Sequence, residues 1–246
     1  MQHRSKKIKK SFFIILVVLI VLSGGSAIYL GNYYHSVDVE KYMNGSSEVS
    51  VEKFDKGWFF DGAGEEKALI FYPGAKVATE AYEPLMYQLA ESGIDCFLVD
   101  MPFHMAFFGM NRAEEIMQEY NYEAWYLGGH SLGGAMAANF VAGYVEDHTD
   151  GIRGLLLLAA YPTKDLSTSD MSVVTVYGSE DGVLNMDKIV AGRELMPQDY
   201  KEVCIEGGNH AQFGSYGAQK GDGTAAIPAE EQWARTVEVF VGDESE

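Results

Sequence analysis

Short, continuous apolar runs recur along this chain, and segments with helical periodicity separate them. Apolar runs that do not alternate with polar residues are typical of parallel strands buried on both faces of a sheet. Six such runs occur, at residues 68–72, 94–99, 124–127, 154–159, 173–177 and 202–205. Helical patterns occupy residues 82–92, 112–120, 132–145, 185–195 and 229–241. This alternation predicts an α/β fold with a mostly parallel central sheet and helices on both faces.

The chain divides into four predicted parts. Residues 48–54 and 58–61 predict two short strands that pair across a turn, and with the runs above they define one domain at 48–246. Before this domain we expect a basic cytoplasmic leader at 1–10, one apolar helix at 11–30 and a linker at 31–47. A total of 246 residues is the usual size of one such domain with a short extension.

The segment at 11–30 has the length and composition of a membrane anchor. It holds 20 residues without a charge, and 12–22 is an unbroken run of Phe, Ile, Leu and Val. At about 1.5 Å per residue, a helix of this length spans the roughly 30 Å hydrocarbon layer of a bilayer. The five basic residues before it favour the cytoplasmic side, so we expect a single-pass protein of the cell membrane with its domain outside.

A cleaved signal peptide is the alternative interpretation of the same segment. Small residues at 25–27 resemble a cleavage site, and cleavage would make the protein secreted. The apolar residues at 28–30 continue the stretch beyond that site, which favours retention as an anchor. Both interpretations export the domain.

The charge of the chain limits its partners. Residues 1–30 carry five basic and no acidic side chains, whereas the rest carries 13 basic and 36 acidic ones, a net charge of −23. A chain segment with this negative charge repels the phosphate backbones of nucleic acids and anionic lipid headgroups. We therefore expect no nucleic-acid partner. Solubility alone is an alternative explanation of the acidic composition.

The sequence Gly129-His130-Ser131-Leu132-Gly133 matches the pattern G-x-S-x-G. The match lies between an apolar strand and a helical segment, where a sharp turn would project the Ser131 hydroxyl beyond the edge of the sheet. Such a turn strains the backbone of the serine, and side chains at 129 or 133 would collide with the neighbouring strand and helix. The N-terminus of the following helix favours negative charge. The context therefore indicates a nucleophile.

A serine nucleophile needs a base, and the base needs a partner that orients it. Asp181 follows the predicted strand at 173–177, and His210 follows the one at 202–205. Because all three residues follow carboxyl ends of parallel strands, we expect them to meet at one edge of the sheet. The alternative for Asp181 is a cap of the helix that begins near 185.

With these motifs the chain resembles the α/β-hydrolase superfamily, in particular its small, lidless members similar to esterases and dienelactone hydrolases. The resemblance covers about residues 48–241 and includes the acid loop at 178–181, the histidine loop at 208–210 and Phe71-Tyr-Pro-Gly-Ala75 after an early strand. It implies the α/β-hydrolase fold and acyl transfer through Ser131, with His210 as base and Asp181 as orienting acid. Pro73 stands where the family usually has histidine.

The resemblance also implies where a negative oxygen would be stabilised. The backbone N–H groups of Leu132 and Ala75 would donate to it, with Lys76 as the second choice for the latter. A small-molecule carboxylic ester is the expected substrate, and thioesters or amides use the same machinery. The non-enzymatic alternative is a surface binding module that retains the fold.

The walls of the site are expected from residues 101–108. Phe103 and Phe107 would line an apolar pocket together with Met105 and Phe108, and His104 is a candidate for substrate contact. The alternative is that these aromatic residues pack beneath their loop. Only 13 residues, 160–172, connect two of the strands, which is too few for a helical cap, so we expect an open site.

No metal and no other cofactor is expected. The sequence contains no His-Glu-x-x-His motif, no close cluster of cysteine and histidine, and no glycine-rich loop with the lysine spacing of a P-loop. The chain has two cysteines, Cys96 and Cys204. In the family's strand order they fall five strand spacings, or roughly 24 Å, apart. A disulfide requires Cα atoms within about 7 Å, so both thiols are expected to be free and buried.

Overall fold

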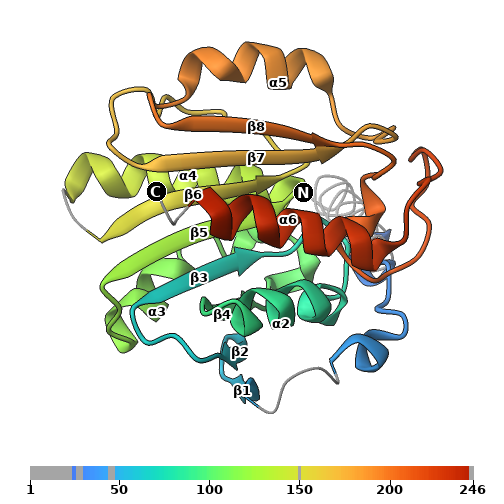
Figure 1. The fold of residues 1–246 in the computed structure, drawn as a ribbon, viewed down its shortest axis with the longest axis horizontal. Coiled ribbons are helices and arrows are strands. Elements are labelled where there is room, and N and C mark those ends of the chain that lie inside the picture. Colours follow the sequence, from blue (N-terminus) through green and yellow to red (C-terminus); the bar gives the residue numbers. More distant parts are fainter. Residues whose placement is uncertain (1–23, 26–29, 44–47, 149–150, 244–246) are drawn as a thin grey trace, which may run out of the picture. The chain divides into compact units, whose positions relative to one another are not determined.

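A central sheet of eight strands organises the computed structural model, which describes residues 24–25, 30–43, 48–148 and 151–243 (Figure 1). The strands are β1 (Ser50–Phe54), β2 (Gly57–Asp61), β3 (Lys67–Tyr72), β4 (Asp95–Val99), β5 (Ala124–His130), β6 (Ile152–Leu158), β7 (Ser172–Gly178) and β8 (Tyr200–Ile205). They lie in the order β1-β2-β4-β3-β5-β6-β7-β8. The strands from β3 to β8 are parallel, and β1 and β2 add antiparallel pairs at one edge.

Helices cover both faces of the sheet, because alternate residues of each strand point to opposite sides. Leu69 and Phe71 of β3 belong to one core, whereas Ala68, Ile70 and Tyr72 belong to the other. The first core is closed by α2 (Glu83–Glu91) and α6 (Ala229–Asp243), which lie side by side in Figure 1. The second is closed by α3 (Arg112–Glu119) and α4 (Leu132–Asp147), while α5 (Met186–Gly192) follows β7.

The predicted strands and long helices all form, with ends shifted by only a few residues. The expected hairpin is also present, since β1 and β2 pair in antiparallel orientation. The compact unit that carries the sheet begins at Tyr34, within the segment 31–47 that the sequence predicts as a linker. Tyr34 forms a parallel bridge to Val77, and its N–H donates to the carbonyl of Lys76 at 2.7 Å. Backbone pairing therefore joins this part of the expected linker to the domain.

The predicted leader at 1–10 and most of the predicted anchor at 11–30 lie outside the described residues. Within the part of the chain that the structure describes, no helix is long and apolar enough to cross a membrane.

The two cysteines lie on strands five positions apart, Cys96 on β4 and Cys204 on β8, and both are free. Cys96 is fully buried, as expected. The prediction that Cys204 is buried is wrong, because this thiol is exposed. Within the edge strand β8 only Ile205 is buried, so the faces of this strand are incompletely covered.

The strand order locates the edge at which a site is expected. From β3 the chain turns to one side of the sheet to form β4 and then crosses to the other side to form β5. Parallel α/β sheets bind ligands at the carboxyl ends of the strands, where such a reversal opens a crevice. Ser131 directly follows the carboxyl end of β5, beside this reversal.

Candidate active site

Ser131 lies in the turn between β5 and α4 in a strained backbone conformation. Its φ is 54° and its ψ is −121°, in a region that residues with a side chain rarely occupy. The Ser131 N–H donates to the carbonyl of Leu158 on β6 at 2.9 Å, and its carbonyl accepts from Ala135 at 3.1 Å. These two bonds fix the turn to the sheet and to the helix.

The glycines on either side of this turn are required by close packing. A Cβ at Gly129 would lie 2.6 Å from the backbone carbon of Gly133, and one at Gly133 would lie 2.1 Å from the carbonyl oxygen of Tyr72. Both separations are far below normal van der Waals contact. The helix can therefore approach the ends of β5 and β3 only because both positions lack a side chain.

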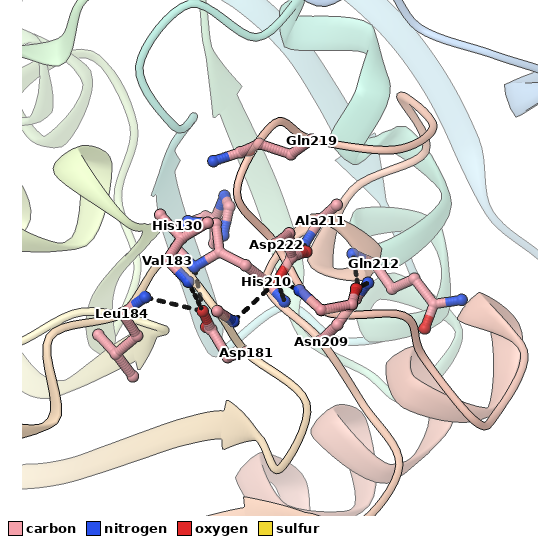
Figure 2. Close-up of polar contacts among 12 residues, drawn as sticks. His130, Asp181, Val183, Leu184, Asn209, His210, Ala211, Gln212, Gln219 and Asp222 are labelled. Atoms are coloured by element: carbon pink, nitrogen blue, oxygen red, sulfur yellow. Dashed lines mark hydrogen bonds and ion pairs between the residues drawn. The ribbon is translucent and has the colours of Figure 1, made fainter.

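His210 and Asp181 form a buried pair beside the turn. The distance from Nδ1 of His210 to Oδ2 of Asp181 is 2.8 Å, and both side chains are 2% exposed. Figure 2 shows the two residues pointing toward each other from the loops after β8 and β7. Nε2 of His210 is buried and has no hydrogen-bond partner in the described part of the chain. This nitrogen remains available to a reacting hydroxyl.

The second carboxylate oxygen of Asp181 is held by the backbone of its own loop. Oδ1 accepts from the N–H groups of Val183 and Leu184, both at 2.8 Å. The helix α5 is capped by Asn185, whose side chain accepts from the N–H of Lys188 at 3.2 Å. The alternative interpretation of Asp181 as the cap of this helix is therefore not supported.

Asp222 is a residue that the sequence analysis missed. Its Oδ1 accepts from the N–H of Gly182 at 3.1 Å and from that of His210 at 3.3 Å, and its Oδ2 accepts from Ala211 at 2.8 Å. Figure 2 shows Asp222 beside the histidine loop. One carboxylate thus joins the loop that carries Asp181 to the loop that carries His210. The signal in the sequence was an aspartate between two glycines, Gly221 and Gly223, typical of a tight turn.

Ser131 and His210 line a common cavity of about 260 Å³. Its other lining residues are mostly small or apolar: Leu132, Ala135, Ala159, Ala160, Tyr161, Val183, Leu184 and Asn185. The predicted pocket residues Phe103, His104 and Phe107 do not line it. The prediction is corrected on this point, because the loop after β4 carries Phe103 and Phe107 to the surface, where they are 59% and 67% exposed.

The N–H groups near Ser131 differ in their availability. The N–H of Gly74 donates to the Tyr82 hydroxyl at 3.0 Å, and that of Lys76 donates to the carbonyl of His104 at 2.7 Å. Lys76, the second choice for an oxyanion donor, is therefore already engaged. Among the described residues, the N–H of Ala75 has no acceptor. Leu132 is the first residue of α4, where backbone N–H groups have no partner within the helix.

His130 is buried beneath the site and packs against the Tyr82 and His210 side chains. Its Nδ1 is 2.7 Å from the Tyr82 hydroxyl, and its ring centroid is 4.5 Å from that of His210. Because Gly74 donates to the Tyr82 oxygen, the tyrosine proton can be donated to Nδ1 of His130. Burial above all lowers the pKa of His130 well below its usual value, so this ring is neutral. Its position is one of structural packing beneath the site.

The fold described above is that of an α/β hydrolase, and comparison with known proteins agrees with it. The sequence model described as the alpha/beta hydrolase family (Abhydrolase_5) matches residues 68–234. The chain therefore belongs to the alpha/beta hydrolase family. Among curated proteins, no sequence matches significantly.

Solved structures with a similar fold include several hydrolases. Est1E from Butyrivibrio proteoclasticus has 16% identity and a TM-score of 0.56, covering 81% of this chain and all of its own. Carboxylesterase CesB from Bacillus subtilis has 9% identity and a TM-score of 0.56, covering 83% and 95%. A bacterial membrane phospholipase A has 12% identity and a TM-score of 0.59, covering 96% and 100%. At these identities the likeness concerns the fold.

The described residues include no group of three or more histidine, cysteine or acidic side chains arranged to hold a metal ion.

Proposed function

We propose that this protein is a serine hydrolase that cleaves carboxylic esters, with Ser131 as nucleophile, His210 as base and Asp181 as orienting acid. The observation that carries the proposal is a buried histidine–aspartate pair that shares one cavity with a serine on a strained turn. Neutral serine is a poor nucleophile, and such a pair is the usual means of activating it. The similar structures include one described as a carboxylesterase, which supports the choice of an ester.

In the first step the Ser131 oxygen attacks the ester carbonyl carbon while Nε2 of His210 accepts the hydroxyl proton. Asp181 holds Nδ1 at 2.8 Å, so only Nε2 is directed to this task, and the carboxylate stabilises the imidazolium that forms. The carbonyl oxygen becomes negative and accepts hydrogen bonds from the N–H groups of Leu132 and Ala75. The C–O bond to the alcohol then breaks, and His210 returns its proton to the departing alcohol.

In the second step water replaces the serine. His210 accepts a proton from the water, whose oxygen attacks the acyl carbon, and the Ser131 oxygen leaves with that proton. The products are the free acid and the regenerated enzyme. Each donor to the negative oxygen contributes about 3 kcal/mol to stabilisation of the transition state, which makes the turn at Leu132 as important as the base.

We place this activity at the outer face of a cell membrane. The uncharged stretch at 11–30 has the length of a spanning helix, and the basic residues before it favour a cytoplasmic start. The similarity of fold to a protein described as a membrane phospholipase A supports this placement. Protease protection of the intact membrane fraction tests it, since the domain is expected to be accessible from the outside only.

Labelling with a fluorophosphonate probe tests the proposed chemistry. The full-length protein is expected to react, the Ser131→Ala variant is not, and a Ser169→Ala control, which changes a serine outside the cavity, reacts as the wild type does. Hydrolysis of 4-nitrophenyl esters of increasing chain length then defines the acyl preference. A wild-type protein that is folded and does not react with the probe would contradict the proposal and favour the non-catalytic alternative.

A further inference from the structure

The loop after β4 exposes three phenylalanines at the edge of the sheet where Ser131 lies. Phe103, Phe107 and Phe108 are 59%, 67% and 54% exposed. They are neighbours, because ring centroids lie 5.7 Å apart for Phe103 and Phe108 and 5.5 Å apart for Phe107 and Phe108. We call these three residues the aromatic patch. A cluster of aromatic side chains exposed on a protein surface marks a site of interaction.

The backbone holds the aromatic patch outward. Phe103 and His104 both have positive φ values, 58° and 54°, which are unfavourable for residues with a side chain. Ala106, between the exposed rings, is fully buried, and Met101, before them, is 6% exposed, so the loop is anchored to the core at both points. Strain maintained by such anchoring is typical of functional positions. The phenylalanines are therefore presented by a fixed loop.

The aromatic patch lies near Tyr34, the first residue of the unit that carries the sheet. Tyr34 pairs with Lys76 and Ala78 through backbone bonds of 2.7 and 2.8 Å, and the N–H of Lys76 donates to the carbonyl of His104 at 2.7 Å. Paired backbone segments lie roughly 5 Å apart, so these two steps place His104 roughly 10 Å from Tyr34. Leu30, the end of the predicted anchor, precedes Tyr34 by four residues, which span at most roughly 14 Å. A bilayer that holds residues 11–30 therefore lies within reach of the aromatic patch.

We propose that the aromatic patch rests on the surface of a zwitterionic lipid bilayer and that the substrate is an ester lipid taken from that bilayer. Phenylalanine rings partition into the boundary between headgroups and acyl chains. A net charge of −23 after residue 30 disfavours anionic lipids, which leaves a zwitterionic surface as the partner. β4 and β5 are separated only by β3 and end at the same edge, so the bound loop brings Ser131 close to the lipids. The inference rests on the proposed membrane-anchored hydrolase.

Bromine quenching of tryptophan fluorescence tests contact with the lipids directly. The full-length protein is placed in phosphatidylcholine nanodiscs with brominated acyl chains, as a Phe107→Trp variant and as a Val190→Trp control on α5. Val190 is 53% exposed, similar to the patch residues, but lies on a helix that follows β7. After subtraction of the wild-type signal, at least twofold quenching is expected at position 107 and none at 190. Equal quenching at the two positions would overturn the inference. It would also be overturned if residues 11–30 or a second copy of the chain, rather than lipid, covered the aromatic patch.

A kinetic measurement tests the consequence for the substrate. Hydrolysis of monooleoylglycerol in a phosphatidylcholine bilayer is compared with hydrolysis of soluble 4-nitrophenyl butyrate. The ratio of the two rates is expected to fall at least tenfold when all three phenylalanines become serine, and to stay within twofold in a Met186→Ser, Val190→Ser control. An unchanged ratio contradicts the inference. Fluorophosphonate labelling of Ser131 is independent of the aromatic patch, so a labelled protein without quenching disproves only the bilayer contact, and an unlabelled one disproves the hydrolase.

Discussion

Replacement of Asp222 tests whether its carboxylate holds the loop that carries Asp181 and the loop that carries His210 in their relative positions. Asp222→Ala removes the acceptor for the N–H groups of Gly182, His210 and Ala211, at 3.1, 3.3 and 2.8 Å. Hydrogen bonds to a charged group contribute about 1.5 to 3 kcal/mol each, and Asp222 is only partly buried, so water replaces part of the loss. We expect the free energy of unfolding to fall by about 2 to 4 kcal/mol.

The effect on catalysis follows from geometry rather than from stability. A displacement of about 1 Å between reacting groups costs about a hundredfold in rate. We therefore expect kcat of Asp222→Ala on a soluble ester to fall about a hundredfold, with KM within threefold because Asp222 does not line the cavity at Ser131. Asp222→Asn keeps one acceptor oxygen and is expected to lose only about tenfold in kcat.

The assay combines steady-state kinetics with urea denaturation, both well below the melting temperature. Asp165→Ala is the matched control, since Asp165 is an exposed aspartate that accepts one backbone N–H, from Ser167 at 2.9 Å. It should leave kcat unchanged. The reasoning is refuted if Asp222→Ala is folded and retains wild-type kcat, or if Asp165→Ala has the same defect.

Three further predictions concern packing, protonation and thiol access. Gly133→Ala places a Cβ 2.1 Å from the carbonyl of Tyr72, so urea denaturation should show a loss of about 3 kcal/mol or more, and wild-type stability would disprove the close approach. Burial, and then the neighbouring carboxylates, raise the pKa of Glu83 to about 7, so the folded protein favours the protonated side chain. The stability that this preference contributes is complete below about pH 4.5 and is lost as the pH rises through 7. Glu83→Gln should therefore stabilise the protein at pH 8 relative to pH 4.5, by up to roughly 3 kcal/mol, and a pH-independent effect would contradict this. Ellman's reagent should modify one thiol of the native protein, exposed Cys204, and reach buried Cys96 only after unfolding; two equally fast thiols would contradict the burial of Cys96.

The sequence was most informative where local pattern and global fold agree. The strand at 124–127 and the helix at 132–145 were predicted from continuous apolar runs and helical spacing, which depend on neighbours along the chain. The glycines at 129 and 133 marked the turn between them, because only glycine permits such a close approach. The meeting of Asp181 and His210 was predictable because parallel strands end at one edge.

Other features depend on contacts between residues far apart in the chain. Asp222 lies 41 residues after Asp181 in a loop without a regular pattern, and only the folded loops place its carboxylate against Gly182. The direction of Phe103 and Phe107 was open for the same reason, since loop conformation follows from packing of Met101 and Ala106 below. Apolar character alone does not distinguish a pocket wall from an exposed patch.

By itself the sequence determined the order of strands and helices, the strained turn at Ser131 and the residue types of the site, because periodicity and glycine requirements are local properties of the chain. The tertiary structure alone decided which N–H groups remain available near Ser131, how Asp222 joins two loops, and that Cys204 and the aromatic patch face outward. The physical reason is that burial and hydrogen-bond pairing are set by segments distant in sequence, which compete for the same donors and the same space.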